Sequence, residues 1–374
     1  MNDRSALELL LRDGPLTRVG LGERTGLSKV TASQLLARLQ ERDLVEVVGT
    51  RSAGRGPSAE LYAIRPGCSY SIGVDLNPDR VRVAVADVMG SVVGRVERSV
   101  NGATDPKRLI HDAAVTVTDE AGIELVAVDE VVIGMPGVVD PASGDIELSF
   151  DLPGWHRGLR DVLAADLGCD LTFENDVNLA AVAERAEGAG REVDDLVLLW
   201  VGRGVGLAVV LGGRLHRGAT GAAGEIGYLP MPGVSAPARI DRPAEGAFQG
   251  LVGAGAVIEL ARQHGIVAAD AADAVAVALA GGDGSERFLR VLADRLALGV
   301  AAVCAVVDPA LVVVSGEIGA TGGAALCELL AGGVRHIASV HPKVVPTAVD
   351  DAVLRGAVLT AVEKARRTLF SSSE

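Results

Sequence analysis

The sequence predicts an α/β protein in which a small helical module precedes a duplicated, two-lobed α/β body with a cleft between its lobes. Two observations carry this prediction. A run of three short strands joined by tight turns is expected at residues 70–100, and a second at residues 194–218; each is followed by helices and a further apolar strand. The expected boundaries are 1–66 for the module, 70–190 and 191–350 for the lobes, and 351–369 for a C-terminal helix returning to the first lobe.

The composition is that of a globular chain with a large apolar core. Of the 374 residues, 49% are apolar but only 3% aromatic, so the core must consist mainly of Leu, Val, Ile and Ala. No apolar run reaches the ~18 residues of a membrane span, and the N-terminus has no signal-peptide pattern. The scattered cysteines show neither pairing nor metal-ligand spacing: Cys68, Cys169, Cys304 and Cys327. These features predict a cytoplasmic protein with no membrane segment.

Charge is distributed unevenly along the chain. Residues 1–66 contain ten Lys or Arg against eight Asp or Glu, a net charge of +2, whereas the whole chain carries −14, which leaves −16 for the remainder. Because like charges repel, only the N-terminal segment is suited to approach a polyanion.

The N-terminal segment predicts three helices in close succession. Residues 5–12 carry apolar positions at helical spacing. Thr17 is a good N-cap for a second helix, Arg18 to Thr25, which Gly26 ends. Ser28 caps a third helix, in which the expected buried stripe is Val30, Leu35, Leu36 and Leu39, with Lys29, Thr31, Ala32, Ser33, Gln34 and Arg38 on other faces.

Two alternating strands follow, at about Leu44–Val48 and Glu60–Ile64, around a loop that contains Gly and Arg. Helix, turn, helix and wing in this order predict a winged helix-turn-helix that binds double-stranded DNA through polar side chains on base edges and cations on phosphates or in a minor groove. The predicted DNA-binding residues are Ser28, Lys29, Thr31, Ser33, Gln34, Arg38, Arg51 and Arg55. The alternative is a helical capping or dimerisation module with ordinary surface polar residues.

The body contains one dense polar cluster, "FENDVN" at residues 173–178, where an apolar strand ends and a helix begins. In duplicated α/β folds, ligands bind in the cleft, at the carboxyl ends of strands and the N-termini of helices. From the residues alone, Asn175 and Asp176 serve either as ligand contacts or merely as caps of the helix near Val177.

Five segments in order give the body a recognisable resemblance: "GMPGVVDPASGDI", "LPGW", "ENDVNLAAVAE", "GRGVGLAVVLGGRLHRGATGAAGEIG" and "VVVSGEIG". The chain resembles, over about residues 70–365, the ROK family of sugar kinases and sugar-responsive repressors. The resemblance implies a body of the actin/hexokinase type. A winged helix in front of such a body resembles the repressor branch, since the kinases lack one.

The resemblance also implies a sugar site. In the family's kinases the residue matching Asp176 is the base that deprotonates a sugar hydroxyl, and those matching Asn175 and Glu225 hydrogen-bond hydroxyls. A carboxylate accepts hydrogen bonds and an amide both donates and accepts, which suits a polyol. The predicted ligand-binding residues are Gly137, Asn175, Asp176, Glu225, Tyr228 and Gln249.

Two loops depart from the kinase pattern. The first phosphate loop of the kinases is a Gly-Gly-Thr-Lys-like turn after an Asp, but here it reads "DLNPDR", in which Pro78 lacks an N–H and Asp79 adds negative charge. The second, "GRGVG", has Arg203 where the kinases usually carry Thr. Since phosphoryl transfer needs donors around the triphosphate, these changes argue against kinase activity, and no catalytic residue or cofactor is expected.

The family's structural zinc is not expected either. Many members place a His after "GEIG" and three Cys in the following loop. Here the His position is Tyr228, and the Cys positions are Ile240, Arg242 and Ala247; Gly246 is retained, and Gln249 stands where a sugar-contacting Glu would be. Tyr228 and Gln249 still offer hydrogen bonds to hydroxyls, with different reach and charge.

Together these features predict a ROK-type transcriptional regulator, of the repressor kind, that binds a palindromic DNA operator as a homodimer or homotetramer and senses a sugar or sugar derivative in the interdomain cleft. Two alternatives remain open at this point: an ATP-dependent sugar kinase with a regulatory head, and a ligand-independent DNA-binding scaffold.

Overall fold

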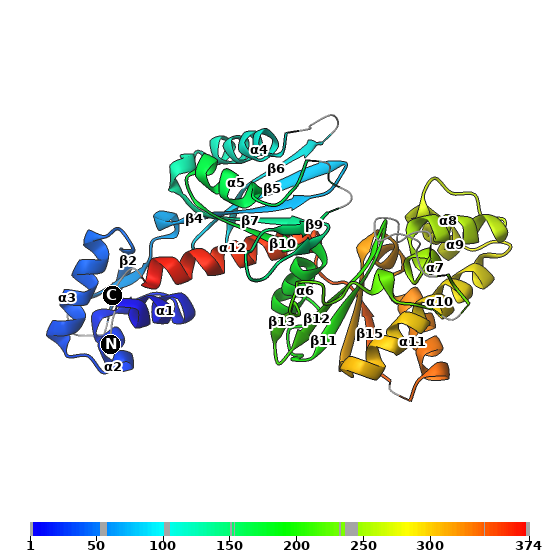
Figure 1. Ribbon diagram of the computed structural model, residues 1–374. Coiled ribbons are helices and arrows are strands. Elements are labelled where there is room, and N and C mark those ends of the chain that lie inside the picture. Colours follow the sequence, from blue (N-terminus) through cyan, green and yellow to red (C-terminus); the bar gives the residue numbers. More distant parts are fainter. Residues whose placement is uncertain are drawn as a thin grey trace. The chain divides into compact units, whose positions relative to one another are not determined.

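The computed structural model describes residues 3–371 except 53–57, 101–104, 150, 151, 153, 232, 236–245 and 340 (Figure 1). Contacts within the chain divide it into two units. Unit 1 comprises Met1–Ile133, Leu159–Thr172 and Ala357–Glu374, and unit 2 comprises Gly134–Gly158 and Phe173–Gly356.

The N-terminal part of unit 1 is a winged helix-turn-helix, as predicted. Its elements are α1 (Asp3–Asp13), β1 (Leu16–Thr17), α2 (Arg18–Thr25), α3 (Lys29–Glu41), β2 (Val45–Arg51) and β3 (Ala59–Ile64). The strands form one sheet in the order β1-β3-β2. The Thr17 side chain caps α2 by accepting from Gly20 N, and Ser28 caps α3 by accepting from Thr31 N. The capping residues therefore set both helix starts where the sequence predicts them.

The predicted face of α3 is wrong at two positions. Val30 is 67% exposed, whereas Ala32 is fully buried. The buried residues of α3 are Ala32, Leu35, Leu36 and Leu39. Their spacing of three, four and seven from residue 32 is that of one helical face, and residue 30 lies off it.

The remainder of unit 1 is built on a five-stranded sheet with the order β10-β7-β4-β5-β6. Its strands are β4 (Tyr70–Leu76), β5 (Arg80–Asp87), β6 (Val92–Ser99), β7 (Val128–Met135) and β10 (Asp170–Asn175), of which β7 and β10 end in unit 2. The accompanying helices are η1 (Pro66–Cys68), α4 (Pro106–Ala121), η2 (Leu125–Ala127) and α5 (Leu159–Leu167). β4, β5 and β6 pair antiparallel, as their predicted tight turns require.

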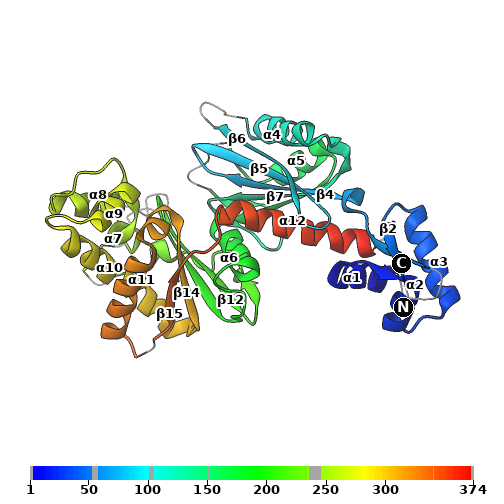
Figure 2. The same ribbon diagram turned by 180° about the vertical axis from the view of Figure 1, so that it is seen from behind.

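The last helix, α12 (Ala352–Ser371), begins in unit 2 and ends in unit 1. At its end, Phe370 is buried in the same apolar cluster as the winged-helix residues Leu7, Leu36 and Tyr62. Arg366 Nε donates a 2.7 Å hydrogen bond to the carbonyl oxygen of Val88, which belongs to that cluster too. The end of α12 therefore completes the core of the winged helix, and Figure 2 shows it beside α1 and β2.

Unit 2 contains a second five-stranded sheet, with the order β13-β12-β11-β14-β15. Its strands are β11 (Leu196–Val201), β12 (Val205–Leu211), β13 (Arg214–His216), β14 (Leu311–Ser315) and β15 (Lys343–Pro346). β11 pairs antiparallel with β12 and parallel with β14. Three consecutive strands followed by two crossover strands repeat the arrangement of the first sheet, which confirms the predicted duplication.

The other elements of unit 2 are mostly helices. They are β8 (Val138–Val139), β9 (Ile146–Leu148), α6 (Asp176–Glu187), η3 (Ile226–Tyr228), α7 (Gln249–Val252), α8 (Ala254–Gln263), α9 (Ala271–Ala280), α10 (Ser285–Val307) and α11 (Gly316–Ile337). Phe248 and Phe288 are fully buried in a core made otherwise of aliphatic residues. None of the helices in the described part of the chain combines the length and apolar character needed to span a membrane.

Helix α6 is fastened to the chain that enters α12. The Glu184 carboxylate is fully buried, and it accepts hydrogen bonds of 2.6 to 2.9 Å from Thr347 Oγ1 and from the backbone N–H groups of Ala189, Ala348 and Val349. One turn further along α6, Glu187 forms an ion pair with Arg355. Gly356 packs so closely on the carbonyl oxygen of Leu179 that any side chain there would collide with it. α6 thus determines the position of the first turn of α12.

We expect Glu184→Ala to lower the free energy of unfolding of unit 2 by about 2–3 kcal/mol, because three backbone N–H groups and one hydroxyl lose their buried acceptor. Urea unfolding followed by tryptophan fluorescence measures this effect, since the only tryptophans, Trp155 and Trp200, both lie in unit 2. Glu187→Ala is the control; its ion pair is partly exposed, so its loss should cost under about 1 kcal/mol. Equal losses in both variants would contradict the role given to Glu184.

Candidate functional site

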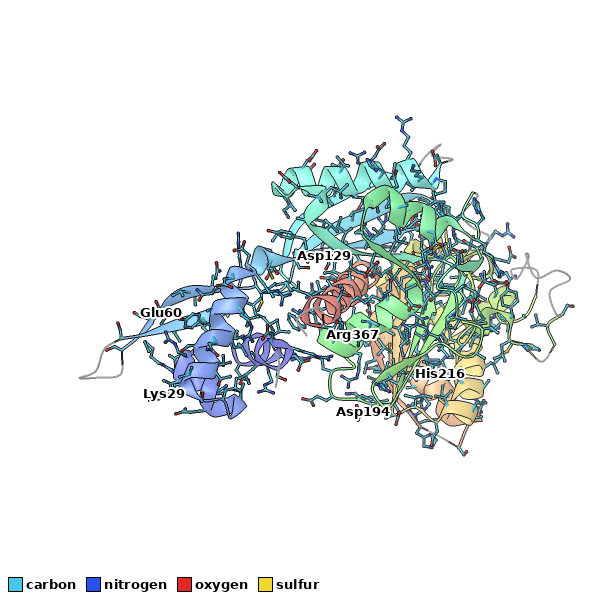
Figure 3. The ribbon with its side chains drawn as sticks, turned by 60° about the vertical axis from the view of Figure 1, so that its left-hand side comes forward. Lys29, Glu60, Asp129, Asp194, His216 and Arg367 are labelled. Carbon is cyan, nitrogen blue, oxygen red and sulfur yellow. The ribbon has the colours of Figure 1, made fainter. Side chains whose placement is uncertain are left out.

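The first site is the exposed face of the winged helix. Lys29, Thr31 and Gln34 are exposed on α3, and Arg51 is exposed on the wing strand β2. Figure 3 shows Lys29 on the helical side of this module and Glu60 on its wing hairpin. Arg55 lies outside the described residues. The predicted residues that the structure describes therefore lie on one module.

Four of the predicted DNA-binding side chains already have partners: Ser28 and Thr31, which bond each other, Ser33 and Arg38. Ser28 caps α3, and Ser33 Oγ donates to the Lys29 carbonyl oxygen at 2.8 Å. Arg38 Nη2 donates a 2.6 Å hydrogen bond to Asp3, a largely buried carboxylate in the first turn of α1. Ser28 and Ser33 thus shape the helix, and a DNA phosphate would have to compete with Asp3 for Arg38.

Arg18 is a cation that the predicted set does not include. It donates to Ser33 Oγ at 3.2 Å and lies 3.9 Å from the Glu60 carboxylate. These contacts join α2, α3 and the wing strand β3. No spacing in the sequence signals them, because the three residues come from separate elements.

The second site centres on the "FENDVN" segment, all within unit 2. Glu174 is buried, and its Oε1 accepts from Asn175 N at 3.0 Å and from Asn178 Nδ2 at 2.9 Å. Its Oε2 accepts from Arg217 Nε at 2.7 Å and from Arg217 Nη2 at 2.6 Å. Charge-assisted bonds of this kind hold the carboxylate firmly. Glu174 therefore organises the segment, although sequence reasoning assigned it no role.

Asn175 caps helix α6 and is also hydrogen-bonded to the backbone of Gly137. Its Oδ1 accepts from Asn178 N at 3.1 Å, which caps α6, and its Nδ2 donates to the Gly137 carbonyl oxygen at 3.0 Å. An amide has two donor hydrogens and two acceptor lone pairs, so half of this group's capacity remains. The structure thus brings Gly137 and Asn175 together directly. Asp176, half-buried in the first turn of α6, accepts from Val177 N at 2.9 Å.

Glu225 lies in the "GATGAAGEIG" loop, which directly follows Arg217, the partner of Glu174. Gly224 has a φ of 99° and lies against the carbonyl oxygen of Leu207, where a side chain would collide. In return, Leu207 N donates to the Gly224 carbonyl oxygen at 2.9 Å. Glu225 follows on this anchored backbone, and burial raises the pKa of its carboxyl above its ordinary value. A buried carboxyl with a raised pKa is suited to receive a hydroxyl donor.

Gln249 lies between the "GEIG" turn and the second loop. Its Oε1 accepts from Val205 N at 2.8 Å, and its Nε2 donates to the Arg203 carbonyl oxygen at 3.1 Å. The same side chain lies about 3.5 Å from the position that a side chain at Gly227 would take. The Gln249 amide thus holds the "GRGVG" loop. Tyr228 is half-buried at the end of η3, beside that turn.

The "DLNPDR" loop, in unit 1, uses its own donors internally. Asn77 Oδ1 accepts from Asp79 N at 3.1 Å and from Arg80 N at 3.0 Å. The Asp75 carboxylate is buried and accepts from Arg82 Nε at 3.0 Å. Two backbone donors that a phosphate would need are therefore already bonded.

The described residues contain no group of three or more His, Cys, Asp or Glu that could hold a metal ion. Ala247, at one of the family's Cys positions, is buried with a φ of 51°. Ile240 and Arg242 lie outside the described residues.

Unit 1 also has a cavity of about 470 Å³ away from these residues. Val126, Glu130, Cys169 and Leu369 are among its lining residues. The carboxylate of Glu130 accepts a hydrogen bond from Thr172 Oγ1 at 2.9 Å and lies 3.7 Å from Lys364 Nζ. None of the predicted sugar-binding residues lines this cavity.

The chain is similar to known transcriptional regulators. The xylose repressor of Bacillus subtilis is 24% identical over 238 residues, which cover 62% of this chain and 60% of that protein. The DNA-binding transcriptional dual regulator NagC of Escherichia coli is 24% identical over 233 residues, or 62% and 57% of the two chains. The chain thus spans about 60% of the length of these curated relatives.

Among solved structures, a ROK family transcriptional regulator homologous to the E. coli MLC protein has a TM-score of 0.77 at 17% identity, covering 99% of this chain and 97% of that one. The ROK hexokinase of Thermus thermophilus has a TM-score of 0.66 at 26% identity, covering 80% and 99%. The MarR family matches residues 3–56, and the ROK family matches residues 71–364. Since the latter match covers most of the sequence, the chain belongs to the ROK family.

Proposed function

We propose that the protein is a sugar-responsive transcriptional regulator of the repressor type, which binds operator DNA through its winged helix and has no kinase activity. The observation that carries this proposal is the core that the winged helix shares with helix α12. Phe370, in the last turn of α12, is buried in the apolar cluster of the winged helix, whose helix α3 keeps one face exposed. The relatives named a xylose repressor and a DNA-binding transcriptional dual regulator support the same reading.

The unit 2 site supports a polyhydroxylated ligand. Asp176 and Glu225 offer carboxylate acceptors, and Asn175 retains a donor and an acceptor. The backbone that carries these groups is held in place by two features. Glu174 bonds both Asn175 N and Arg217, and Gly224 packs on the carbonyl oxygen of Leu207. Asp176 then accepts a hydrogen bond from a hydroxyl that it never activates. Tyr228 and Gln249 complete the proposed set, although the Gln249 amide is partly used by its own loop.

The first loop supports the absence of phosphoryl transfer. Its Asp79 and Arg80 N–H groups are bonded to Asn77, and Pro78 has none. A kinase must surround the triphosphate with donors, so this loop would have to break its own turn to bind ATP.

The chain also offers a route for regulation. α6 starts at the proposed sugar site and, through Glu184 and Leu179, holds the entry to α12. α12 ends at Phe370 in the winged-helix core. A ligand that prefers one position of α6 would therefore change the placement of the DNA-reading module, and such a preference is what allostery requires. In a cytoplasmic homodimer or homotetramer, two modules would read the halves of a palindromic operator.

A thermal-shift series with sugars and sugar phosphates, each with and without MgATP, tests the proposal. A ligand at about 100 times its Kd stabilises the folded state by about 2.7 kcal/mol. We expect one sugar class to raise the melting temperature of unit 2, followed by its tryptophans, with no further change from MgATP. A shift with MgATP would instead support a kinase. No shift from any sugar would support the ligand-independent scaffold.

We expect Asp176→Ala to weaken binding of the sugar found in that series about 10- to 100-fold, because a charge-assisted hydrogen bond is lost. Operator affinity without sugar should not change, which gel-shift titration measures. Asp161→Ala is the control, since Asp161 is an exposed carboxylate of unit 1 paired with its neighbour Arg160. Unchanged sugar binding in Asp176→Ala would remove Asp176 from the site.

Sugar affinity should also depend on pH through Glu225. Its pKa is raised by burial, and a hydroxyl that donates to the carboxylate favours the charged form. Binding therefore lowers this pKa, so affinity is full above the raised value and falls as pH drops through it. Calorimetric titration across pH measures the effect, and Glu225→Gln should abolish it. The same pH dependence in Glu225→Gln would assign it to another group.

A further inference from the structure

Val30 is an apolar side chain on the part of α3 that faces away from the core. It is 67% exposed in the first turn of the helix, whereas the other large apolar residues of α3 are buried. Exposed valines occur elsewhere in the chain, for example Val267 and Val306, so exposure alone carries no argument. The position of Val30 supports an argument, because the N-terminal turns of a recognition helix are the part that reaches the edges of the bases.

Val30 shares its face with Gln34. Residues four apart lie one above the other on a helix, and both of these are exposed. The next position on this stripe is Ala37, which is small and exposed. Along this face, Val30 presents methyl groups and Gln34 presents an amide, and the small side chain of Ala37 lets the helix approach another surface closely.

The local structure keeps the Val30 side chain stiff. The Ser28 cap fixes the first turn, through Thr31 N at 3.2 Å and Thr31 Oγ1 at 2.8 Å. Val is β-branched, so within a helix its χ1 has one strongly preferred rotamer. Its two methyl groups consequently hold one position above the turn.

We propose that Val30 reads a thymine, by packing its methyl groups on the C5-methyl group in the major groove, beside an adenine that Gln34 contacts. The C5-methyl is the only methyl group on the major-groove edge of an unmodified base pair, and the amide of Gln, like that of Asn, can form two hydrogen bonds with adenine, at N6 and N7. The inference rests on the proposed DNA binding, and it adds a specificity residue and its base.

The test begins with selection of binding sequences from a pool of random duplexes, using the whole chain. Each thymine of the selected duplex is then replaced singly by deoxyuridine, which removes only the methyl group, and affinity is measured at one fixed salt concentration. We expect one thymine in each half-site where this change weakens binding about 3- to 10-fold, the size expected for one buried methyl contact.

In Val30→Ala the same replacement should have no effect, while the other thymines behave as in the unchanged protein. Val19→Ala is the matched control, because Val19 is 48% exposed but lies on α2; it should keep the full deoxyuridine penalty. Lys29→Ala should weaken binding to all duplexes alike and reduce the salt dependence, as a phosphate contact does.

A penalty that persists in Val30→Ala, or specific binding with no sensitive thymine, would overturn the inference and leave the proposed DNA binding intact. Failure of the selection to enrich any sequence would overturn both. Since Val30 is exposed, its replacement by Ala should leave the melting temperature unchanged, which a thermal scan verifies.

Discussion

The buried carboxylate of Glu184 is the interaction that holds helix α6 to the segment before α12 within unit 2. A fully buried charge is tolerated only when its lone pairs are satisfied, and here one hydroxyl and three backbone N–H groups do so. Two of those N–H groups belong to Ala348 and Val349, just before α12. α6 and the start of α12 therefore cannot move apart without depriving this buried carboxylate of its hydrogen-bond donors.

Much of the fold could be predicted from the sequence because local chemistry determines it. Thr17 and Ser28 cap the helices that they precede, and the repeated three-strand runs become two sheets with the same strand order. The face of α3 was harder to predict, since Val30 is as apolar as Leu35. Only the module's tertiary packing shows that Ala32, not Val30, faces inward.

The sequence suggests the residues of a candidate site, but it does not reveal how they are bonded. The resemblance pointed to Asn175, Asp176 and Glu225, and the structure places Asn175 on Gly137. It could not reveal that Glu174 is paired with Arg217, 43 positions away, or that Gln249 is bonded to the Arg203 loop. Such pairs depend on how distant segments fold together, and no short motif encodes them.

The burial of Phe370 in the winged-helix core has a consequence for synthesis of the chain. The residues of α1 to β3 leave the ribosome early, yet one aromatic ring of their core is translated some 300 residues later. A nascent chain thus carries a winged helix whose core is incomplete, and domains generally fold in order as they emerge. The module reaches its final stability only after the ROK body has been translated. Ribosome-bound fragments that end before Phe370 therefore lack the finished winged helix.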